Sequence, residues 1–361
     1  MTSGKIIDKE MVLDALRTVQ DPELHKDLVS LNMIQDIKIT GNKVYFKVVL
    51  TTPACPLKNK IEKDAREAVL NVTGVEEVEV DMGAKVKADG RDRDQFQLQI
   101  KNAVAIASGK GGVGKSTVAV NVAVALAQSG ASVGLLDADI YGPNVPTMMG
   151  VKSLPTQTGK KLIPAEAYGV KLMSIGFLVN ENDPLIWRGP MLHSAIQQFL
   201  RDVEWGELDY LIIDLPPGTG DAQLSLTQSI PLSGGVIVTL PQQVSLEDAR
   251  RGLEMFRKLN VSILGVVENM SYLELPDGSR VDVFGSGGGQ MLAGATQVPF
   301  MGAIPMDPSV RTGGDQGTPI VVSNPDAPSA QALRKVAESV AARLSVENFA
   351  SVHTPKINFV D

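Results

Sequence analysis

The feature that most constrains this chain is a glycine-rich run, GKGGVGKST, which stands between an apolar stretch and a segment of helical periodicity. The run matches the P-loop pattern, in which Lys115 and Ser116 close the loop. Backbone N–H groups of such a loop surround phosphate oxygens, the lysine reaches the β- and γ-phosphates, and the hydroxyl beside it binds magnesium. The sequence therefore predicts a nucleotide site made by Gly109, Lys110, Gly111, Gly112, Val113, Gly114, Lys115, Ser116 and Thr117.

Apolar runs typical of strands accompany this loop and alternate with segments of helical periodicity. The alternation predicts an α/β fold, a doubly wound parallel sheet covered by helices on both faces. The strand-like runs are residues 103–107, 133–136, 208–213, 236–240 and 263–267, and the clearest helical segments are residues 118–128 and 246–259.

Polar residues stand where these strand-like runs end. Asp137 and Asp139 follow the second run, and Asp214 follows the third. Because the carboxyl ends of parallel strands meet at one edge of a sheet, we expect these carboxylates near the phosphates, with Asp214 holding magnesium. For Asp137 and Asp139, helix capping or turn formation is the alternative. Asn269, after the fifth run, is placed either to contact a base or to form a turn, and the absence of an NKxD motif after the P-loop disfavours guanine.

The residues before the P-loop predict a separate small domain. Alternating apolar side chains from residue 44 to 50 indicate a strand, and Gly41 and Asn42 provide the turn of a hairpin. Helical stripes on either side complete an α+β unit, and a charged, aperiodic stretch after it is typical of a solvated connector. The predicted organisation is a small α+β domain at residues 5–83, a linker at 84–99, a P-loop domain at 100–346 and a tail at 347–361.

Charge and hydropathy exclude some classes of partner. The chain has 34 Lys and Arg residues against 41 Asp and Glu residues, and this net charge of −7 disfavours broad binding to nucleic acid or anionic lipid. No apolar run approaches the ~18 residues of a membrane-spanning helix, and the first residues do not resemble a signal or transit peptide. We therefore expect a cytoplasmic protein with neither nucleic acid nor membrane as a partner.

Several motifs together carry a family resemblance. Lys110 inside the loop marks the deviant Walker A motif of the MinD, ParA and Mrp group of dimerising ATPases. The runs DADIYGPN at 137–144, WRGPM at 187–191, DLPPGTGD at 214–221 and ENMSY at 268–272 resemble the Mrp/ApbC family of iron-sulfur cluster carriers. The run TTPACP at 51–56 is similar to the iron-sulfur assembly domain that precedes the ATPase in bacterial members.

The resemblance implies a function and a set of residue roles. The protein would bind ATP and magnesium, hydrolyse ATP slowly as a switching homodimer, and pass iron-sulfur clusters to apo recipient proteins. Lys110 would reach the partner protomer's phosphates and Asp139 would position the attacking water. Ser116 and Asp214 would serve magnesium, and Asn269 would contact adenine.

One departure from the family pattern concerns the cluster ligands. The family usually carries a CxxC pair shortly after the ENM motif, but here Leu275 and Gly278 occupy those positions, and neither binds iron. Cys55, the single cysteine, precedes a predicted helix whose dipole favours the thiolate, which makes it a candidate cluster ligand; a small buried hydrophobic side chain is the alternative. The alternative function is a MinD/ParA-like ATP-driven dimerisation switch or scaffold without a bound cluster.

Overall fold

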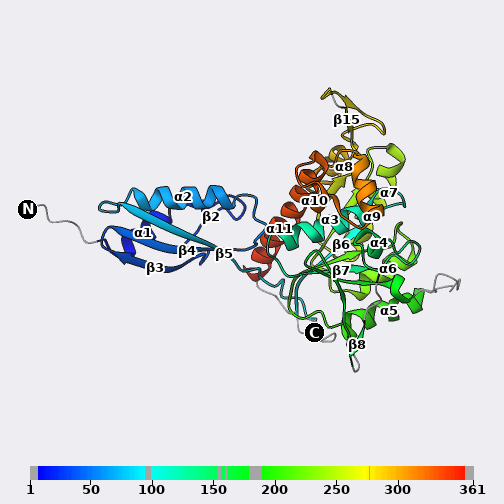
Figure 1. The fold of residues 1–361 in the computed structure, drawn as a ribbon, viewed down its shortest axis with the longest axis horizontal. Helices are drawn as coiled ribbons and strands as arrows, with labels where there is room; N and C mark the ends of the chain where they lie inside the picture. Colours follow the sequence, from blue (N-terminus) through cyan, green and yellow to red (C-terminus); the bar gives the residue numbers. More distant parts are fainter. Residues whose placement is uncertain are drawn as a thin grey trace, which may run out of the picture. The chain divides into compact units, whose positions relative to one another are not determined.

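The chain forms two compact units, each with its own hydrophobic core. The computed structural model describes residues 7–93, 99–152, 156–158, 161–178, 189–275 and 277–353. The first unit comprises residues 1–87 together with 341–361, and the second comprises residues 88–340. Figure 1 shows the elements of both units.

A three-stranded sheet with helices packed on one face builds the first unit. Its elements are α1 (Lys9–Leu16), β1 (Gln20–Asp21), β2 (Lys26–Asp27), β3 (Ile34–Thr40), β4 (Lys43–Leu50), α2 (Lys58–Leu70) and β5 (Glu77–Ala84). β4 lies between antiparallel β3 and parallel β5. Along β4, Val44 and Phe46 point into a core shared with α1 and α2, whereas Lys43 and Lys47 form ion pairs with acids of β5. This confirms the predicted small α+β unit.

The second unit is built around one large sheet. Its strands are β6 (Ile100–Ala107), β7 (Val133–Asp137), β10 (Ala165–Ala167), β11 (Val170–Ser174), β12 (Leu208–Asp214), β13 (Gly234–Thr239), β14 (Ile263–Glu268) and β17 (Phe300–Ala303). Short antiparallel pairs are formed by β8 (Gln157–Thr158) with β9 (Lys161–Leu162) and by β15 (Leu273–Glu274) with β16 (Arg280–Val281). The helices are α3 (Lys115–Gln128), α4 (Val145–Met148), α5 (Gly189–Asp202), α6 (Asp221–Ser229), α7 (Gln243–Lys258), α8 (Gly288–Thr296), α9 (Pro308–Gln316), α10 (Ile320–Ser323) and α11 (Pro328–His353), and residues Ile175–Leu178 form a 3₁₀ turn.

The order of the strands confirms the doubly wound sheet. It runs β10-β11-β7-β12-β6-β13-β14-β17, and every pair is parallel except β10 with β11. β6 lies at the point where the order reverses, between β12 and β13. In such sheets ligands bind beyond the carboxyl end of the strands at this switch point. The loop after β6 therefore occupies the position that the fold reserves for a ligand.

Both faces of this sheet are covered by helices. Ala103 and Ala105 of β6 belong to a core that also includes side chains of α5, α6, α7 and α8. Val104 and Ile106, the alternate residues, are equally buried on the opposite face, where α3 packs against β6, β7 and β12. Burial on both faces explains why these strands are continuous apolar runs rather than alternating ones.

The final helix extends further than the sequence predicts. α11 continues to His353, so the residues from 347 to 353 are helical and not the beginning of a tail. Phe349 packs partly against the core of the first unit, and the Lys26 ammonium lies 4.7 Å from the centroid of its ring. Residues 354–361 lie outside the described part of the chain. Among the described residues no helix has the length and apolarity needed to cross a lipid bilayer.

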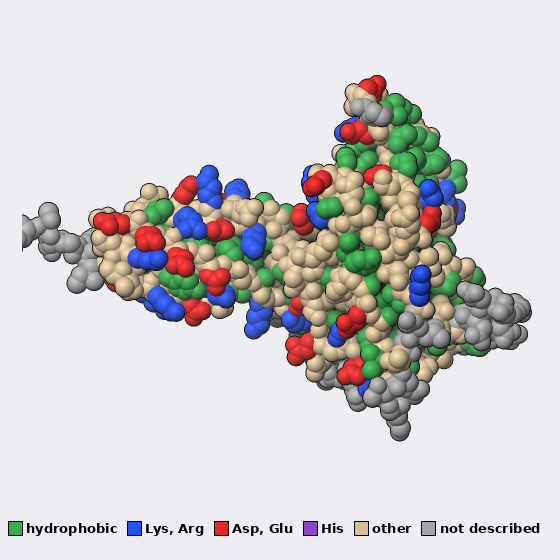
Figure 2. Space-filling view, viewed as in Figure 1, with side chains coloured by type: hydrophobic (Ala, Val, Ile, Leu, Met, Phe, Trp, Pro, Cys, Tyr) green, Lys and Arg blue, Asp and Glu red, His purple; other side chains and the backbone are tan. Residues whose placement is uncertain are grey.

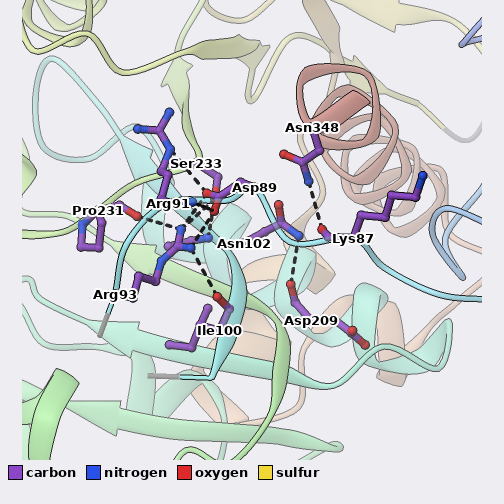
Figure 3. A network of polar contacts seen from close by, with 11 residues as sticks. Lys87, Asp89, Arg91, Arg93, Ile100, Asn102, Asp209, Pro231, Ser233 and Asn348 are labelled. Atoms are coloured by element: carbon purple, nitrogen blue, oxygen red, sulfur yellow. Dashed lines mark hydrogen bonds and ion pairs between the residues drawn. The ribbon is translucent and has the colours of Figure 1, made fainter. Parts of the chain in front are cut away.

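The predicted linker also differs from the structure, because its charged residues build a buried ion pair (Figure 3). The Arg93 guanidinium donates to both carboxylate oxygens of Asp89 at 2.7 Å, and also to the carbonyl oxygens of Ile100 and Pro231. The Ser233 hydroxyl donates to Asp89 Oδ2 at 2.5 Å. These contacts attach residues 89–93 to the first residue of β6 and to the chain just before β13, so the segment is part of the second unit.

The pair is fully enclosed. The side chains of Arg93 and Asp89 are only 4% and 5% exposed. Burial acts to raise the pKa of Asp89, but the hydrogen bonds from Arg93 and Ser233 outweigh it and hold the pKa below its usual range. This stabilisation is present above the pKa that Asp89 has in the unfolded chain, and it is lost as the pH falls through the lower folded value.

Replacing Arg93 should destabilise the second unit strongly. Arg93→Ala leaves the Asp89 carboxylate buried without its cation, and we expect the free energy of unfolding to fall by about 3–5 kcal/mol. Arg91→Ala is the matched control, because Arg91 contacts the same carboxylate at 3.4 Å from an exposed position and should cost less than about 1 kcal/mol. Urea unfolding measures both, and equal losses for the two variants would contradict the buried pair.

Candidate functional site

The loop between β6 and α3 has the backbone of a phosphate-binding turn. Gly114 has φ 81°, a left-handed conformation that favours glycine, and it directly precedes Lys115, the first residue of α3. At Gly109, a Cβ atom would lie 2.1 Å from the carbonyl carbon of Asp248 in α7, so only glycine fits there. The loop therefore stays close to α7 and presents the N-terminus of α3 to the cleft in front of it.

This cleft has a volume of about 320 Å³ and is predominantly lined by the loop. Tyr141 at its rim is 77% exposed, although it is a large aromatic side chain. The lining residues are Ser108, Lys110, Gly111, Gly112, Gly114, Lys115, Ser116, Thr117, Asp139, Tyr141, Gly142, Asn144, Met148 and Pro217. The sequence-predicted phosphate residues and Asp139 are thus brought together.

The Lys115 ammonium stands at the centre of the polar contacts in this cleft. It lies 2.6 Å from Asp214 Oδ1, 3.3 Å from Asp139 Oδ2 and 3.3 Å from the Ser116 hydroxyl. Lys115 is only 5% exposed, so its charge is not dispersed by solvent. A single buried cation is therefore shared by two carboxylates. Asp214 is the last residue of β12, and Asp139 follows the end of β7.

A third carboxylate, Asp137, stands behind this pair. It accepts hydrogen bonds from the Ser174 hydroxyl at 2.8 Å and from the backbone N–H of Asp139 at 3.1 Å, so it holds the backbone that carries Asp139. Burial, and then the charge of Asp214, raise the pKa of Asp137 to about 8. Burial raises the pKa of Asp214 as well, although Lys115 opposes that shift. Asp137 is therefore mostly protonated at neutral pH. Its hydrogen-bond partner Ser174 is not part of any motif that the sequence analysis identified.

The oxygen atoms at this site fit magnesium. Asp214 Oδ2 is buried and has no hydrogen-bond partner, although a carboxylate oxygen is a strong acceptor. The Ser116 hydroxyl lies beside the same Lys115 ammonium. Magnesium takes one or two protein oxygens and completes its shell with water and phosphate oxygens, so Ser116 and Asp214 suffice. No group of three or more His, Cys, Asp or Glu side chains in the described ranges could hold a metal by itself.

Lys110 differs from Lys115 in its surroundings. Its side chain lines the cleft and is half-buried, and no ion pair joins its ammonium to any residue in the described part of the chain. Its backbone carbonyl accepts a hydrogen bond from the Ser108 hydroxyl at 3.0 Å. A hydrogen bond to the main chain of Lys110 therefore holds the loop conformation. The Lys110 ammonium is available to a group that enters the cleft.

Asn269, which the sequence places either to contact a base or to form a turn, contacts the phosphate loop. Its side-chain amide donates to the Val113 carbonyl at 2.9 Å, so it holds the phosphate loop. A Cβ atom on Gly114 would lie 2.1 Å from the same amide nitrogen, which leaves no room for a side chain there. Asn269 is thus placed next to the predicted site, with a contact that sequence reasoning missed.

A second, mostly apolar cavity of about 520 Å³ adjoins the cleft and shares Thr117 and Met148 with it. Its walls come mainly from residues around β17 and α9, and no sequence motif indicated these residues. The sequence indicates only that a helix begins there, because Asp307 and Pro308 form a typical helix start. The lining residues are Thr117, Met148, Asn269, Met270, Phe284, Ile304, Pro305, Met306, Asp307, Pro308, Val310, Arg311, Gly314, Asp315 and Leu333. A planar apolar group attached to phosphates in the cleft fits this arrangement.

Cys55 belongs to the first unit, whereas the phosphate cleft belongs to the second. Cys55 is half-buried and lies three residues before α2, as predicted, and it packs partly against the core of its unit. Leu275 and Gly278 lie in and beside the turn between β15 and β16, and Leu275 is partly exposed. Pro276, and Trp187 and Arg188 of the WRGPM run, lie outside the described residues.

Two family models match the chain. Residues 99–341 match the model described as NUBPL iron-transfer P-loop NTPase, and residues 9–81 match the model of an iron-sulfur cluster assembly protein. Together they cover both units, and the first alone covers more than half of the chain.

Similar proteins agree with these models. The iron-sulfur cluster carrier protein of a Synechocystis species is 55% identical over 350 residues, which span 94% of this chain and 99% of that protein. The iron-sulfur cluster carrier protein of Deinococcus radiodurans is 52% identical over 346 residues, 95% of this chain and 97% of that protein.

Solved structures resemble the second unit. A nucleotide-binding protein of Archaeoglobus fulgidus in complex with ADP has a TM-score of 0.56 and 39% identity, and covers 62% of this chain and 89% of its own. The cell division ATPase MinD of Pyrococcus furiosus has a TM-score of 0.53 and 26% identity, and covers 66% of this chain and 98% of its own.

The raised pKa of Asp137 predicts a pH-dependent stability. The folded pKa near 8 lies above the unfolded value, so the wild-type protein loses stability as the pH rises from about 4 to about 8, whereas Asp137→Asn does not titrate. We compare the free energy of unfolding of the two proteins without nucleotide and magnesium. As the pH rises, the wild-type protein should lose up to about 1.4 kcal/mol per pH unit relative to Asp137→Asn. Urea unfolding at several pH values tests this, and parallel pH profiles would contradict the buried, protonated carboxyl.

Proposed function

Because this chain belongs to the family of NUBPL iron-transfer P-loop NTPases, we propose that it is an ATP-hydrolysing carrier that receives an iron-sulfur cluster and passes it to apoproteins. The observation that carries the nucleotide part is the Lys115 ammonium, which lies between Asp214 and Asp139 at the mouth of a phosphate-binding loop. The cargo is proposed from the family and from the names of the relatives. The cytoplasmic location predicted from the sequence is part of this proposal.

ATP binding starts at the backbone N–H groups of the loop. Phosphate oxygens that enter the cleft compete with Asp214 for the Lys115 ammonium, which is within reach of both. Magnesium bound with the nucleotide would neutralise phosphate charge, held by Ser116 and Asp214. The buried, unpartnered Asp214 Oδ2 supports this assignment. The adjoining apolar cavity would receive the adenine base, with Asn269 at its wall.

Hydrolysis requires a base and a positive charge near the transferred phosphoryl group. Asp139 is the carboxylate placed to orient a water, because Asp137 fixes its backbone and the Tyr141 backbone N–H donates to its Oδ1 at 3.2 Å. Lys110 would supply its charge to the phosphates of a second protomer across a homodimer, which stabilises the transition state. Its ammonium has no ion pair within the described ranges, which supports this role.

The cluster would be held incompletely by this protein. A four-iron cluster normally takes four thiolates, and a dimer of a chain with one cysteine offers two. Cys55, just before α2, is the proposed ligand. The remaining positions would be filled by small thiols or by cysteines of the recipient, which favours handover over storage.

Asp139 and Lys115 should separate hydrolysis from binding. Asp139→Asn keeps the acceptor for the Tyr141 N–H but loses the base, and we expect ATP binding to persist while turnover falls by about 100-fold or more. Lys115→Ala, the companion variant, should lose ATP binding itself. Phosphate release and equilibrium binding measure the two effects, and unchanged phosphate release in both variants would contradict the proposed site.

Cys55 should decide whether the chain carries a cluster. After anaerobic reconstitution we expect substoichiometric, oxygen-sensitive iron and sulfide in the wild-type protein and none in Cys55→Ser, with ATP hydrolysis retained because Cys55 lies in the other unit. Iron and sulfide counts per chain provide the measurement. Binding that is equal without Cys55, or absent from the wild-type protein, would instead favour the MinD/ParA-like switch without a cluster.

A further inference from the structure

Glu268, the last residue of β14, is a buried carboxylate that the proposed chemistry does not use. It is fully buried, and no ion pair joins it to a cation within the described ranges. It accepts hydrogen bonds from the Ser271 hydroxyl, from the backbone N–H of Gly287 at 3.1 Å and from the backbone N–H of Gly289 at 2.5 Å. Its charge is therefore balanced by the N-terminus of α8, where unpaired N–H groups favour an anion.

The chain around Glu268 is packed too closely for another arrangement. A Cβ atom on Gly289 would lie 2.9 Å from the Cβ of Glu268 and 3.2 Å from its Oε2. On Gly288 it would lie 2.4 Å from the carbonyl oxygen of Pro241. The start of α8 is thus pressed against Glu268, and a displacement of one must displace the other.

The next residue connects the same point of the chain to the phosphate loop. The Asn269 side chain donates to the Val113 carbonyl at 2.9 Å, and its backbone N–H donates to the Thr239 carbonyl at 2.8 Å. Glu268 and Asn269 are consecutive, so one peptide bond joins the residue that holds α8 to the residue that holds the phosphate loop. The start of α8 and the phosphate loop are therefore held by two consecutive residues of one short segment.

The hairpin segment, residues 270–287 with β15 and β16, leaves from this point and returns to it. Met270, its first residue, has φ 51°, an uncommon conformation for a side chain of this size. The hairpin segment is also tied to the wall of the apolar cavity, because the Met306 N–H donates to the Tyr272 carbonyl at 2.6 Å. Leu275, Val281 and Val283 are partly or largely exposed on it, and Figure 2 shows hydrophobic side chains over this part of the molecule.

We propose that Glu268 is a positioning residue that links the hairpin segment to the phosphate loop. By holding the N-terminus of α8, it fixes the Glu268–Asn269 peptide and thereby the hydrogen bond from Asn269 to Val113. A change in the hairpin segment then alters nucleotide affinity, and nucleotide binding alters the hairpin segment to the same extent, as linkage requires. The inference rests on the ATP-binding part of the proposed function and is independent of the cargo.

The test is a double-mutant cycle on ATP affinity. Glu268→Gln keeps the shape but replaces one acceptor by an NH₂ group that faces backbone N–H donors, and we expect ATP affinity to fall by about 5-fold or more. Asn269→Ala should also weaken binding. Since Glu268 acts through Asn269, adding Glu268→Gln to Asn269→Ala should cause little further loss, whereas independent structural roles would multiply the two effects. Glu254→Gln, an exposed carboxylate on α7 outside the hairpin segment, is the matched control and should bind ATP like the wild-type protein.

Hydrogen exchange of the same full-length proteins gives the second readout. In the wild-type protein, ATP with magnesium should slow exchange in both the phosphate loop and the hairpin segment. In Glu268→Gln at saturating ATP, the phosphate loop should still be protected, whereas β15 and β16, which do not line the apolar cavity, should not respond. Multiplicative losses in the cycle, or a hairpin response equal to that of the wild-type protein, would overturn the role of Glu268. Failure of the wild-type protein to bind ATP would overturn the proposed function as well, and absence of iron would leave this result unaffected.

Discussion

The site of the second unit depends on one buried ammonium group that pairs with two carboxylates, beside a third, at the carboxyl edge of the large sheet. Lys115 contacts Asp214 and Asp139, and Asp137 stands behind them. One positive charge cannot balance three negative ones among side chains as buried as these. The protein relieves part of this imbalance by raising the pKa of Asp137 to about 8, but Asp214 Oδ2 is still without a hydrogen-bond partner. A second cation is therefore favoured at this point, and magnesium arriving with a nucleotide supplies it.

The same constraint explains why the site is built from the ends of several strands. β7 carries Asp137, β12 carries Asp214, and β14 carries Glu268 and leads to Asn269. Asp214 is stabilised by the lysine, Asp137 is kept neutral by its raised pKa, and Glu268 is stabilised by the N-terminus of α8. Each charge at this edge thus has a different source of compensation. Through the proposed link at Glu268, ATP and the exposed hairpin segment influence each other, and Met270 and Phe284 of that segment also line the cavity proposed for adenine.

The sequence predicts the features that depend on short-range patterns. The P-loop, the strand-end aspartates and the parallel sheet follow from motifs and apolar runs, and the structure brings Lys115, Asp139 and Asp214 together as expected. The Asp89–Arg93 pair could not be predicted in this way, because charge density indicates a solvated linker and the partner Ser233 is distant in sequence. The hydrogen bond from Asn269 to Val113 depends on a side-chain direction that periodicity does not determine. The apolar cavity arises where β17 and α9 approach the phosphate cleft, which only tertiary packing creates.

Asp214 holds Lys115 and is also the proposed ligand of magnesium, and these two roles have opposite effects on nucleotide affinity. The most direct measurement is the affinity for ATP with and without magnesium, in the wild-type protein and in Asp214→Asn. The account predicts that magnesium strengthens ATP binding to the wild-type protein. In Asp214→Asn, magnesium should have little effect, and ATP alone should bind more tightly than it does to the wild-type protein, because the lysine is released and a negative charge is removed. An equal effect of magnesium on both proteins would contradict the account.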